Sequence, residues 1–462
     1  MAGCDGCGED RESVEPGPRA GPLLGVGPVA DATPRDARVA RIARIDRALA
    51  RGAQYLVGLQ DQDGSFRSVN YAAFRDGYSL SPQVLLALWF VQSSDIPAVT
   101  PALDRGGAAP EAEQNRDLQL AKAYQRGVDF VASLVQSDGS LRAGLDGPSY
   151  PYYAITGALL VLNTPGNERH EQAREALIEH IRARQLTEAR GFEPSDPSYG
   201  GWGYSPGIPQ RPAAGDGSDP RVAGNLSATL FSLGAIRLAG VPADDPAMQR
   251  ALQFVMRCQN WRDADAGEPA RPADRGSSAS AEPAFDDGGF FFSPVIPDSN
   301  KAGAAGEDRS GQTRYRSYGS MTADGLRALL RLGLPPEHPR VQSATAWLLS
   351  NFDPAQNPGS FPAEAEVRRA SSYYYYVWSS AHALRTVGAT TVTTADGPIH
   401  WAEALAEVLL ERQREDGSWS NPYTELREDD PLIATPFAIA GLATARMALG
   451  RMYRSHGYID SP

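Results

Sequence analysis

The sequence predicts an all-α fold, an (α/α)6 toroid in which six helical hairpins close into an inner and an outer ring of helices. Three observations support this prediction. A short phrase of Gln, a Gly turn and an aromatic residue recurs along the 462-residue chain. A charged amphipathic helix comes before each copy, and a helix that is apolar almost all round comes after it. Self-similarity at such a long period is typical of architectures built from repeats.

The first and last copies of the repeated phrase are the best formed. Gln60 precedes the run Asp-Gly-Ser-Phe at 63–66, and Gln413 precedes the run Asp-Gly-Ser-Trp at 416–419. The Gly supplies a positive φ, the Gln can reach backbone groups that the helix end leaves free, and the aromatic can cover the next hairpin. An open superhelix would need atypical capping repeats at its ends, so well-formed end copies favour a closed ring. The weaker copies end in the runs 138–141, 200–204, 286–290 and 358–361.

Each hairpin should place its charged helix on the outer surface and its apolar helix in the buried inner ring. In the last hairpin we expect the outer helix at 401–412 and the inner helix at 433–449. The other inner helices are expected at 82–91, 153–162, 225–238, 320–332 and 374–387.

The hairpins should form one toroid domain over residues 37–455, between a disordered N-terminal tail (1–36) and a C-terminal tail (456–462). The N-terminal tail is rich in Gly, Pro, Ala and charge, a composition that buries too little apolar surface to fold. Loops of similar composition would serve as a lid, as a partner surface or simply as tolerated insertions. Three such long loops are expected near 97–115, 207–221 and 262–284.

Composition argues against several partners. The formal net charge of −12 disfavours nucleic acid and anionic membranes. We find no run of about 18 apolar residues, so we expect no transmembrane segment. The 3 cysteines, Cys4, Cys7 and Cys258, are too few for a disulfide scaffold, and the pair Cys4-x-x-Cys7 lacks the further ligands of a zinc site. No metal and no cofactor are expected.

The first residues of the chain bear on localisation. They are polar and acidic and show no signal peptide, which as written indicates a cytoplasmic protein. The triplet Ala2-Gly3-Cys4 also looks like the tail of a bacterial lipoprotein cleavage box. If the true start lies upstream, the protein would instead be exported or lipid-anchored.

The repeated phrases resemble those of a known superfamily. The copies around Gln60 and Gln413 resemble the "QW" repeat of squalene-hopene cyclases. The runs Gly-Gly-Trp-Gly-Tyr (200–204) and Asp-Gly-Gly-Phe (287–290) resemble the repeat of protein prenyltransferase β-subunits. The resemblance covers roughly residues 45–450. It implies an α/α toroid with a hydrophobic or aromatic central cavity, which in known members often holds an isoprenoid.

The reaction motifs of that superfamily are missing. Class II terpene cyclases protonate an alkene with a D-x-D-D motif, because an alkene is a very weak base and needs a strong acid. The nearest candidates here, Asp263-x-Asp265 and the acidic run 428–430, do not have that spacing. Prenyltransferases hold zinc with Asp, Cys and His, but Cys258 falls on an expected outer helix, away from the inner wall. The sequence therefore predicts neither the usual acid nor a zinc site.

One aromatic group on the fifth inner helix is a candidate site. Tyr375, Trp378 and His382 have the spacing i, i+3 and i+7, which places them on one helix face. On the inner wall they would offer two π surfaces, which stabilise cations, and a base. The alternative is that this face packs against the neighbouring inner helices and that His382 is a core histidine.

Two acidic positions are the other catalytic candidates. Asp324 is either a buried acid that faces the cavity or a first-turn residue favoured by the helix dipole, with Ser320 as the cap. Asp430, in the run Glu-Asp-Asp, is either an acid or cation ligand at the mouth of the ring or a helix N-cap on a solvated rim.

By symmetry, residues that start the inner helices should surround the same mouth, which is the natural pocket of a toroid. Together with Tyr375 and Trp378, the expected cavity residues are Tyr78, Tyr152, Tyr153, Asn225, Ser227 and Tyr318.

The sequence thus points to a prenyltransferase/squalene cyclase repeat protein that binds a hydrophobic, isoprenoid-like ligand in its central cavity. A divergent terpene cyclase is one version of this function, but the absent acid motif leaves enzymatic activity open. Two alternatives come from other classes: a non-catalytic binding or scaffold protein that kept the toroid, and a polysaccharide-active enzyme, since lyases also use helical toroids with Tyr or His as base.

Overall fold

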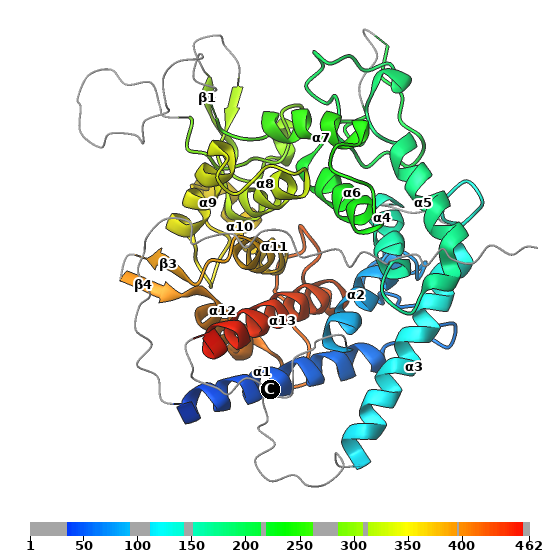
Figure 1. Ribbon diagram of the computed structural model, residues 1–462, viewed down its shortest axis with the longest axis vertical. Helices are drawn as coiled ribbons and strands as arrows, with labels where there is room; N and C mark the ends of the chain where they lie inside the picture. Colours follow the sequence, from blue (N-terminus) through cyan, green and yellow to red (C-terminus); the bar gives the residue numbers. More distant parts are fainter. Residues whose placement is uncertain are drawn as a thin grey trace, which may run out of the picture.

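The computed structural model describes residues 35–92, 111–142, 151–213, 219–261, 285–307, 313–394 and 397–455. The predicted tails lie almost wholly outside these residues, and so do the predicted loop at 262–284 and most of the loop at 97–115. The prediction of a mainly helical chain is confirmed (Figure 1).

Twelve of the helices alternate between an outer and an inner position, as the repeats predict. The outer helices are α1 (Arg35–Gly58), α3 (Glu111–Leu134), α5 (Glu171–Ala183), α7 (Pro246–Arg257), α9 (Pro339–Asn351) and α12 (Trp401–Arg412). The inner helices are α2 (Ser81–Gln92), α4 (Pro151–Leu162), α6 (Leu226–Leu238), α8 (Gly319–Arg331), α11 (Tyr373–Thr386) and α13 (Pro431–Ser455).

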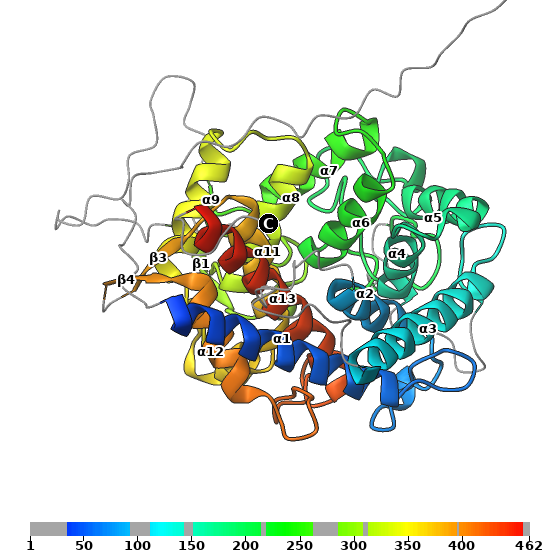
Figure 2. The ribbon, with the colours of Figure 1, turned by 60° about the horizontal axis from the view of Figure 1, so that its bottom comes forward.

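The inner helices contact one another in a closed cycle. Each contacts the next inner helix along the chain, and the last, α13, contacts the first, α2. Figures 1 and 2 show the inner helices gathered around the centre, with the outer helices at the periphery.

Side chains of the repeated Gln residues join neighbouring hairpins. Gln60 Nε2 donates to the carbonyl of Gly64 in its own turn (2.9 Å) and to that of Ala123 in α3 (2.7 Å). Gln413 does the same with its own turn and with Ala48 of α1 (2.8 Å), so the last hairpin is bonded to the first. Equivalent pairs of bonds run from Gln185 to Gly200 and Ala247, and from Gln259 to Gly288 and Arg340.

The Gly and the aromatic residue of each phrase also have defined roles. Gly417 has φ +92°, and a Cβ there would lie 2.7 Å from the carbonyl oxygen of Arg51. The turn therefore packs directly against the backbone of α1. The indole of Trp419 is fully buried and donates to the carbonyl of Leu409 (2.8 Å). The phrase is therefore a joint between hairpins.

Two parts of the chain correct the all-α prediction. Short antiparallel hairpins form from β1 (Ala304–Glu307) with β2 (Thr313–Tyr315), and from β3 (Thr391–Thr394) with β4 (Gly397–His400). These strands are three or four residues long and lie in connections, where no periodic pattern marks them. The remaining short elements are α10 (Glu366–Ala370) and the 3-10 turns at Ala72–Phe74, Glu168–His170, Glu188–Arg190, Pro297–Ser299 and Ala363–Ala365.

Two predicted boundaries also move. Helix α1 begins at Arg35, inside the predicted tail, and α3 begins at Glu111, inside the predicted loop at 97–115. The residues at 111–115, Glu-Ala-Glu-Gln-Asn, include several strong helix formers, so the helix extends into this stretch.

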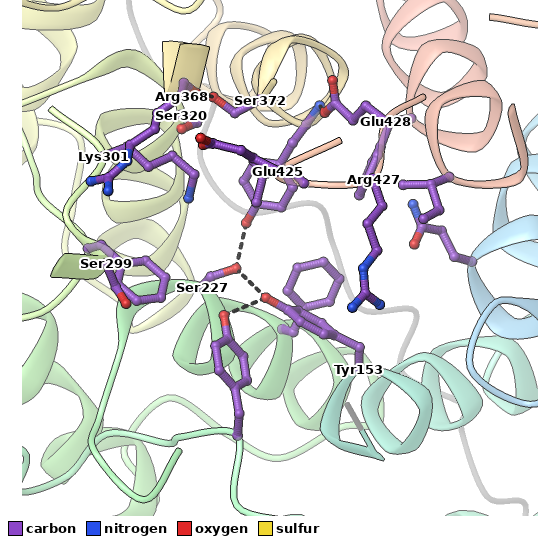
Figure 3. Close-up of a pocket in the computed structure, with 18 of the residues that line it drawn as sticks. Tyr153, Ser227, Ser299, Lys301, Ser320, Arg368, Ser372, Glu425, Arg427 and Glu428 are labelled. Atoms are coloured by element: carbon purple, nitrogen blue, oxygen red, sulfur yellow. Dashed lines mark hydrogen bonds between the residues drawn. The ribbon is translucent and has the colours of Figure 1, made fainter. Parts of the chain in front are cut away.

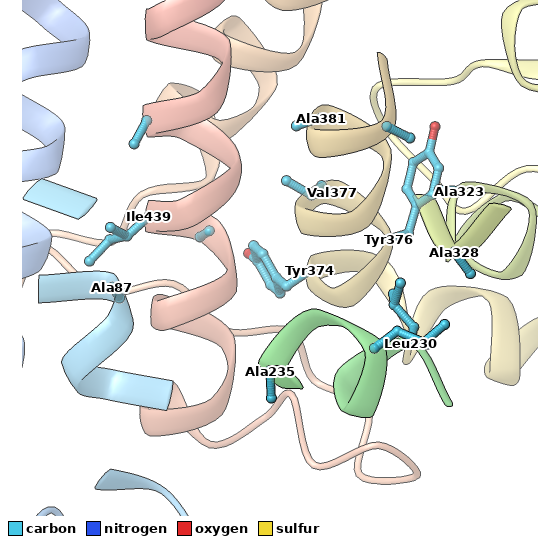
Figure 4. Close-up of a cluster of buried hydrophobic side chains, with 14 of the residues drawn as sticks. Ala87, Leu230, Ala235, Ala323, Ala328, Tyr374, Tyr376, Val377, Ala381 and Ile439 are labelled. Carbon is cyan, nitrogen blue, oxygen red and sulfur yellow. The ribbon is translucent and has the colours of Figure 1, made fainter. Parts of the chain in front are cut away.

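The core extends over the outer and inner helices, and the contacts between neighbouring inner helices contain many small residues. Ala328 of α8, Val377 and Ala381 of α11 and Ile439 of α13 are buried there (Figure 4). At Gly441 of α13 a Cβ would lie 2.5 Å from a side-chain carbon of Val377, so these two helices approach too closely for any larger residue.

Helix α13 bears on the prediction that the chain has no transmembrane segment. Within the described residues, its stretch Pro431–Met452 is long and apolar enough to cross a membrane by length and composition, with a mean hydropathy of 1.6. The sequence has no unbroken apolar run of about 18 residues here, because Arg446 interrupts it. In the structure, 83% of the apolar window is buried inside the protein, as in a core helix.

Candidate functional site

Two adjoining cavities lie among the inner helices, with volumes of about 440 and 460 Å³. Their sizes fall within the range of ligand pockets. The first cavity lies at the N-terminal ends of the inner helices, and the second extends toward their C-terminal ends. Both are lined by Ser79, Gln83, Tyr153, Phe231 and Phe437.

The first cavity has a mixed lining (Figure 3). Aromatic side chains such as Tyr204 and Phe292 lie beside charged ones. Lys301 places its ammonium 5.4 Å from the ring centre of Phe292, and burial lowers the pKa of this amine to about 8. The charged residues of the lining are Asp298, Lys301, Arg368, Glu425, Arg427 and Glu428.

The second cavity is mainly aromatic. Trp378 stacks on Phe231 with ring centres 5.3 Å apart, and Phe437 lies 5.5 Å from the same indole. Trp89 and Phe90 of α2 complete this wall. Three arginines of the inner helices line the same cavity: Arg327, Arg331 and Arg385.

A chain of hydroxyl groups runs from the first cavity to a buried carboxyl. The Tyr204 and Tyr153 hydroxyls are 2.6 Å apart, and the Tyr153 hydroxyl is 3.0 Å from Oγ of Ser227. That oxygen is 2.8 Å from the hydroxyl of Tyr375, which donates to Oδ2 of Asp324 over 2.6 Å. Figure 3 shows the hydroxyl part of this chain on the cavity wall.

Asp324 lies behind the wall of the cavity and does not line it. It is fully buried, accepts hydrogen bonds from Tyr375 and Ser379, and lies 3.8 Å from the guanidinium of Arg327. Burial raises the pKa of its carboxyl to about 6, although Arg327 and the two hydroxyls oppose the shift. The first-turn interpretation was wrong: α8 begins at Gly319, and its N-cap is Tyr318.

His382 lines the second cavity as a neutral base. Its Nδ1 lies 2.9 Å from the carbonyl of Trp378, so the proton belongs on Nδ1 and Nε2 carries the lone pair. Burial, and then the charge of Arg327, hold the pKa of the imidazole well below its usual value. Trp378, Tyr375 and Tyr153 also line the cavities, as predicted from the sequence.

Asp430 does not have the predicted position at the mouth. It is buried, its Oδ1 accepts the amide of Leu432 (2.9 Å), and its Oδ2 accepts the hydroxyl of Ser68, so it caps α13 and lines neither cavity. This arrangement corrects the interpretation as a cavity acid or cation ligand.

Of the acidic run 428–430, Glu428 is the residue that lines the first cavity, together with Asp298 and Glu425. The carboxylate of Glu428 accepts hydrogen bonds from the backbone N–H groups of Tyr374 (3.0 Å) and Tyr375 (2.8 Å) and from the side-chain amide of Asn421 (2.7 Å). Glu428 therefore caps the N-terminus of α11, although it lies just before α13 in the sequence. Burial raises the pKa of its carboxyl to about 8.

Four predicted cavity residues line neither cavity. Tyr152 is fully buried against Ser232, and Asn225 caps α6 by accepting the amide of Ala228 (2.9 Å). Successive helix residues point about 100° apart, so Tyr152 and Tyr153 cannot both face the axis. The other two are Tyr78 and Tyr318, both buried in the core.

Several lining residues were missed by sequence reasoning. Phe231, Phe437 and Lys301 carry no motif. The arginines of α8 did leave a signal, because Arg327 and Arg331 are spaced i, i+4 in a helix that is otherwise buried. Within the described ranges, no group of three or more His, Cys, Asp or Glu is placed to hold a metal, and Cys258 is fully buried.

Comparisons with known proteins give the following similarities. No protein-family model matches the chain. A stretch of 138 residues, 29% of this chain, is 40% identical to a terpene cyclase–glycosyl transferase fusion protein, fsoA, from Humicola fuscoatra, and the match spans only 8% of that relative.

Solved structures resemble the chain at low identity. A variant of the type II terpene cyclase MstE from Scytonema, in complex with its substrate geranylgeranyl dihydroxybenzoate, aligns with a TM-score of 0.48 and 13% identity over 89% of this chain and 99% of that one. A glycosidase in complex with glucose aligns with a TM-score of 0.41 and 10% identity over 88% and 98% of the two chains.

Proposed function

We propose that the chain is an (α/α)6 toroid of the prenyltransferase/squalene cyclase repeat type whose axial cavities bind a hydrophobic, isoprenoid-like ligand, and that it is a divergent terpene cyclase. The observation that carries this proposal is the aromatic cavity enclosed by the inner helices. The closed cycle of helix contacts and the Gln413 bond to α1 support the toroid.

The aromatic wall suits the intermediates of cyclisation. Tyr375, Trp378 and Phe437 lie within 5.5 Å of one another, measured between ring centres, and Phe231 stacks on the same Trp. An aromatic face stabilises a nearby cation by about 0.5–2 kcal/mol, and more when water is excluded. A carbocation that forms beside this cluster would be stabilised by these ring faces.

The Asp324–Tyr375 contact supplies the proton chemistry. Cyclisation by protonation is an isomerisation: one proton adds to the substrate and one leaves. A phenol alone is too weak an acid for an alkene, and burial raises the pKa of Tyr375 further. In the step that we propose, the protonated carboxyl of Asp324 donates to the Tyr375 oxygen, the reverse of the hydrogen bond in the structure, while Tyr375 gives its own proton to the alkene. The proton that the product loses returns to Asp324 through Tyr375. Arg327 stabilises the carboxylate that is left behind.

A second candidate is a binding protein without catalysis. It is favoured by the pKa of about 6 at Asp324, because such a carboxyl is a weaker acid than alkene protonation usually demands. Both candidates need the same ligand and the same cavity, and they differ only in turnover.

The test is to identify what the purified protein carries. Native mass spectrometry and solvent extraction are expected to recover a hydrophobic molecule from the wild type and less of it from Trp378→Ala and Phe231→Ala. Incubation with an extracted isoprenoid, followed by mass spectrometry with chromatography, separates a cyclase (a product of equal mass and new retention time) from a binder. Recovery of a bound glycan would favour the polysaccharide-active alternative, and recovery of nothing in repeated preparations would overturn the proposal.

A further inference from the structure

The arginine end of the second cavity, defined here as Arg327, Arg331 and Arg385, carries more positive charge than its surroundings balance. Arg327 and Arg331 lie one turn apart on α8, and Arg385 is close to the end of α11. All three line the cavity beside the aromatic wall. Like charges at i, i+4 repel each other, and the cost grows when they are removed from water.

Only one of the three has a carboxylate partner among the described residues. Arg327 lies 3.8 Å from Asp324 and places its guanidinium 4.3 Å from the ring centre of Trp378. Arg331 and Arg385 form no ion pair in the described part of the chain. The Nε of Arg385 is buried without a hydrogen-bond partner, and Arg331 makes a long contact of 3.5 Å to the carbonyl of Leu230. Two guanidinium groups are thus left with unused donors.

The surroundings make room for these groups without neutralising them. At Gly234 of α6, a Cβ would lie 2.9 Å from Nη1 of Arg331, so the absence of a side chain there leaves space for the guanidinium. His382, which also lines this cavity, is held neutral, and the charge of Arg331 is among the causes. The C-terminal ends of α8 and α11 offset part of the charge of Arg331 and Arg385, which is the competing structural explanation.

We propose that the arginine end binds the anionic head group of the ligand, a carboxylate or a phosphate, while the ligand's hydrocarbon chain lies along the aromatic wall toward the first cavity. The placement of the ligand's hydrocarbon chain rests on the proposed function. The binding of its anionic head group rests on the three arginines. Guanidinium groups match both anions because their planar donors form paired hydrogen bonds to two oxygens.

The experiment compares probes that share one chain and differ in the head group. Binding of farnesol, farnesoic acid, farnesyl monophosphate and farnesyl diphosphate to the delipidated wild-type protein is measured by titration calorimetry in about 0.1 M salt. We expect the anionic probes to bind at least tenfold more tightly than farnesol, about 1.4 kcal/mol. A preference for the acid or for the phosphates tells the two head groups apart.

Variants then locate the preference. Arg331→Gln and Arg385→Gln are expected to reduce the anion preference severalfold and to leave the Kd of farnesol unchanged. Arg47→Gln, on the exposed face of α1, is the matched control and should change neither. Without ligand, the Tm of Arg331→Gln should stay the same or rise, because the variant removes a repulsion.

Each contrary result has its own meaning. Equal binding of farnesol and the anionic probes would overturn the head group site and leave the proposed function standing. A lower Tm in Arg331→Gln with an unchanged anion preference would show that the arginines are structural. Failure of every probe to bind would overturn both proposals together.

Discussion

The hydroxyl of Tyr375 donates a hydrogen bond to Oδ2 of Asp324 over 2.6 Å, and this contact joins a side chain on the cavity wall to a carboxyl that is sealed from the cavity. The same hydroxyl lies 2.8 Å from Ser227, which also lines the cavity. A proton that moves between Asp324 and a ligand would therefore pass through Tyr375. This arrangement separates the group that holds the proton from the group that touches the ligand.

Removal of the Tyr375 hydroxyl should stop proton transfer while it leaves the binding site intact. Tyr375→Phe keeps the ring that packs on Trp378 and Phe437, so the ligand should still co-purify in wild-type amount. Turnover should fall by roughly 100-fold or more, the usual worth of a positioned acid–base group. Product formation under single-turnover conditions measures the loss.

Ser379→Ala is the matched control for this variant. Ser379 also donates to Asp324, but it is buried and lines neither cavity. Its loss should change turnover much less than Tyr375→Phe does. A Tyr375→Phe protein that turns over like the wild type would exclude the relay.

Glu428 should make the stability of the protein depend on pH above the acidic range. Its pKa is raised from 4.5 to about 8, so the folded state binds this proton more tightly than the unfolded state does. The stabilisation is complete below pH 4.5 and is lost as pH rises through 8. At about 1.4 kcal/mol per pKa unit, this shift contributes at most roughly 5 kcal/mol to the free energy of unfolding.

The measurement is the free energy of unfolding in urea, at several pH values between 5 and 9, for the wild type and Glu428→Gln. The wild type should lose stability relative to the variant as pH rises, because Gln does not titrate. Asp429→Asn, at the adjacent position, is the control. A difference between wild type and Glu428→Gln that stays flat over this range would contradict the raised pKa.

The mainly helical fold was predictable because repeated phrases make local joints between hairpins. Gln60 and Gln413 make the same two bonds at opposite ends of the chain, so their side chains carry information on the assembly of neighbouring hairpins. The alternation of charged and apolar helices predicted the inner and outer positions. A helix buried on one face keeps charged residues on the other face, whereas a helix buried on all faces is apolar almost all round. The strands left no such trace.

The site was less predictable because it depends on which way a side chain turns. Tyr152 and Tyr153 are indistinguishable by position in the repeat, yet one faces the core and the other the cavity. Glu428 and Asp430 are two residues apart, and only the backbone path before α13 decides that one caps α11 and the other caps α13. The arginine end combines residues from two helices. The sequence does not show how each helix is rotated about its axis, so it does not show that these side chains share a cavity.

The turn glycines should differ in importance according to what lies behind them. Gly200 has φ +84°, and a Cβ there would lie 2.0 Å from the carbonyl oxygen of Arg250 in α7. Gly240 has φ +96° but has nothing within 4 Å of the same position. Gly240→Ala should therefore cost only backbone strain, about 1–3 kcal/mol, whereas Gly200→Ala must also push two hairpins apart. Thermal unfolding of both variants measures their losses of stability. Equal losses would mean that the close approach of Gly200 to α7 adds nothing to the cost of the substitution.

The bond from Gln413 to Ala48 should contribute to the stability of the ring as much as the bonds inside it do. Gln413→Ala removes two hydrogen bonds and leaves the Ala48 carbonyl without this donor, an expected loss of about 2 kcal/mol. Gln60→Ala removes the equivalent pair between the first two hairpins and is the matched comparison. Similar losses in urea unfolding are expected, because in the proposed toroid the joint between the last and first hairpins is equivalent to the other joints. A Gln413→Ala protein of wild-type stability, beside a destabilised Gln60→Ala, would instead indicate that the ring opens readily between α12 and α1.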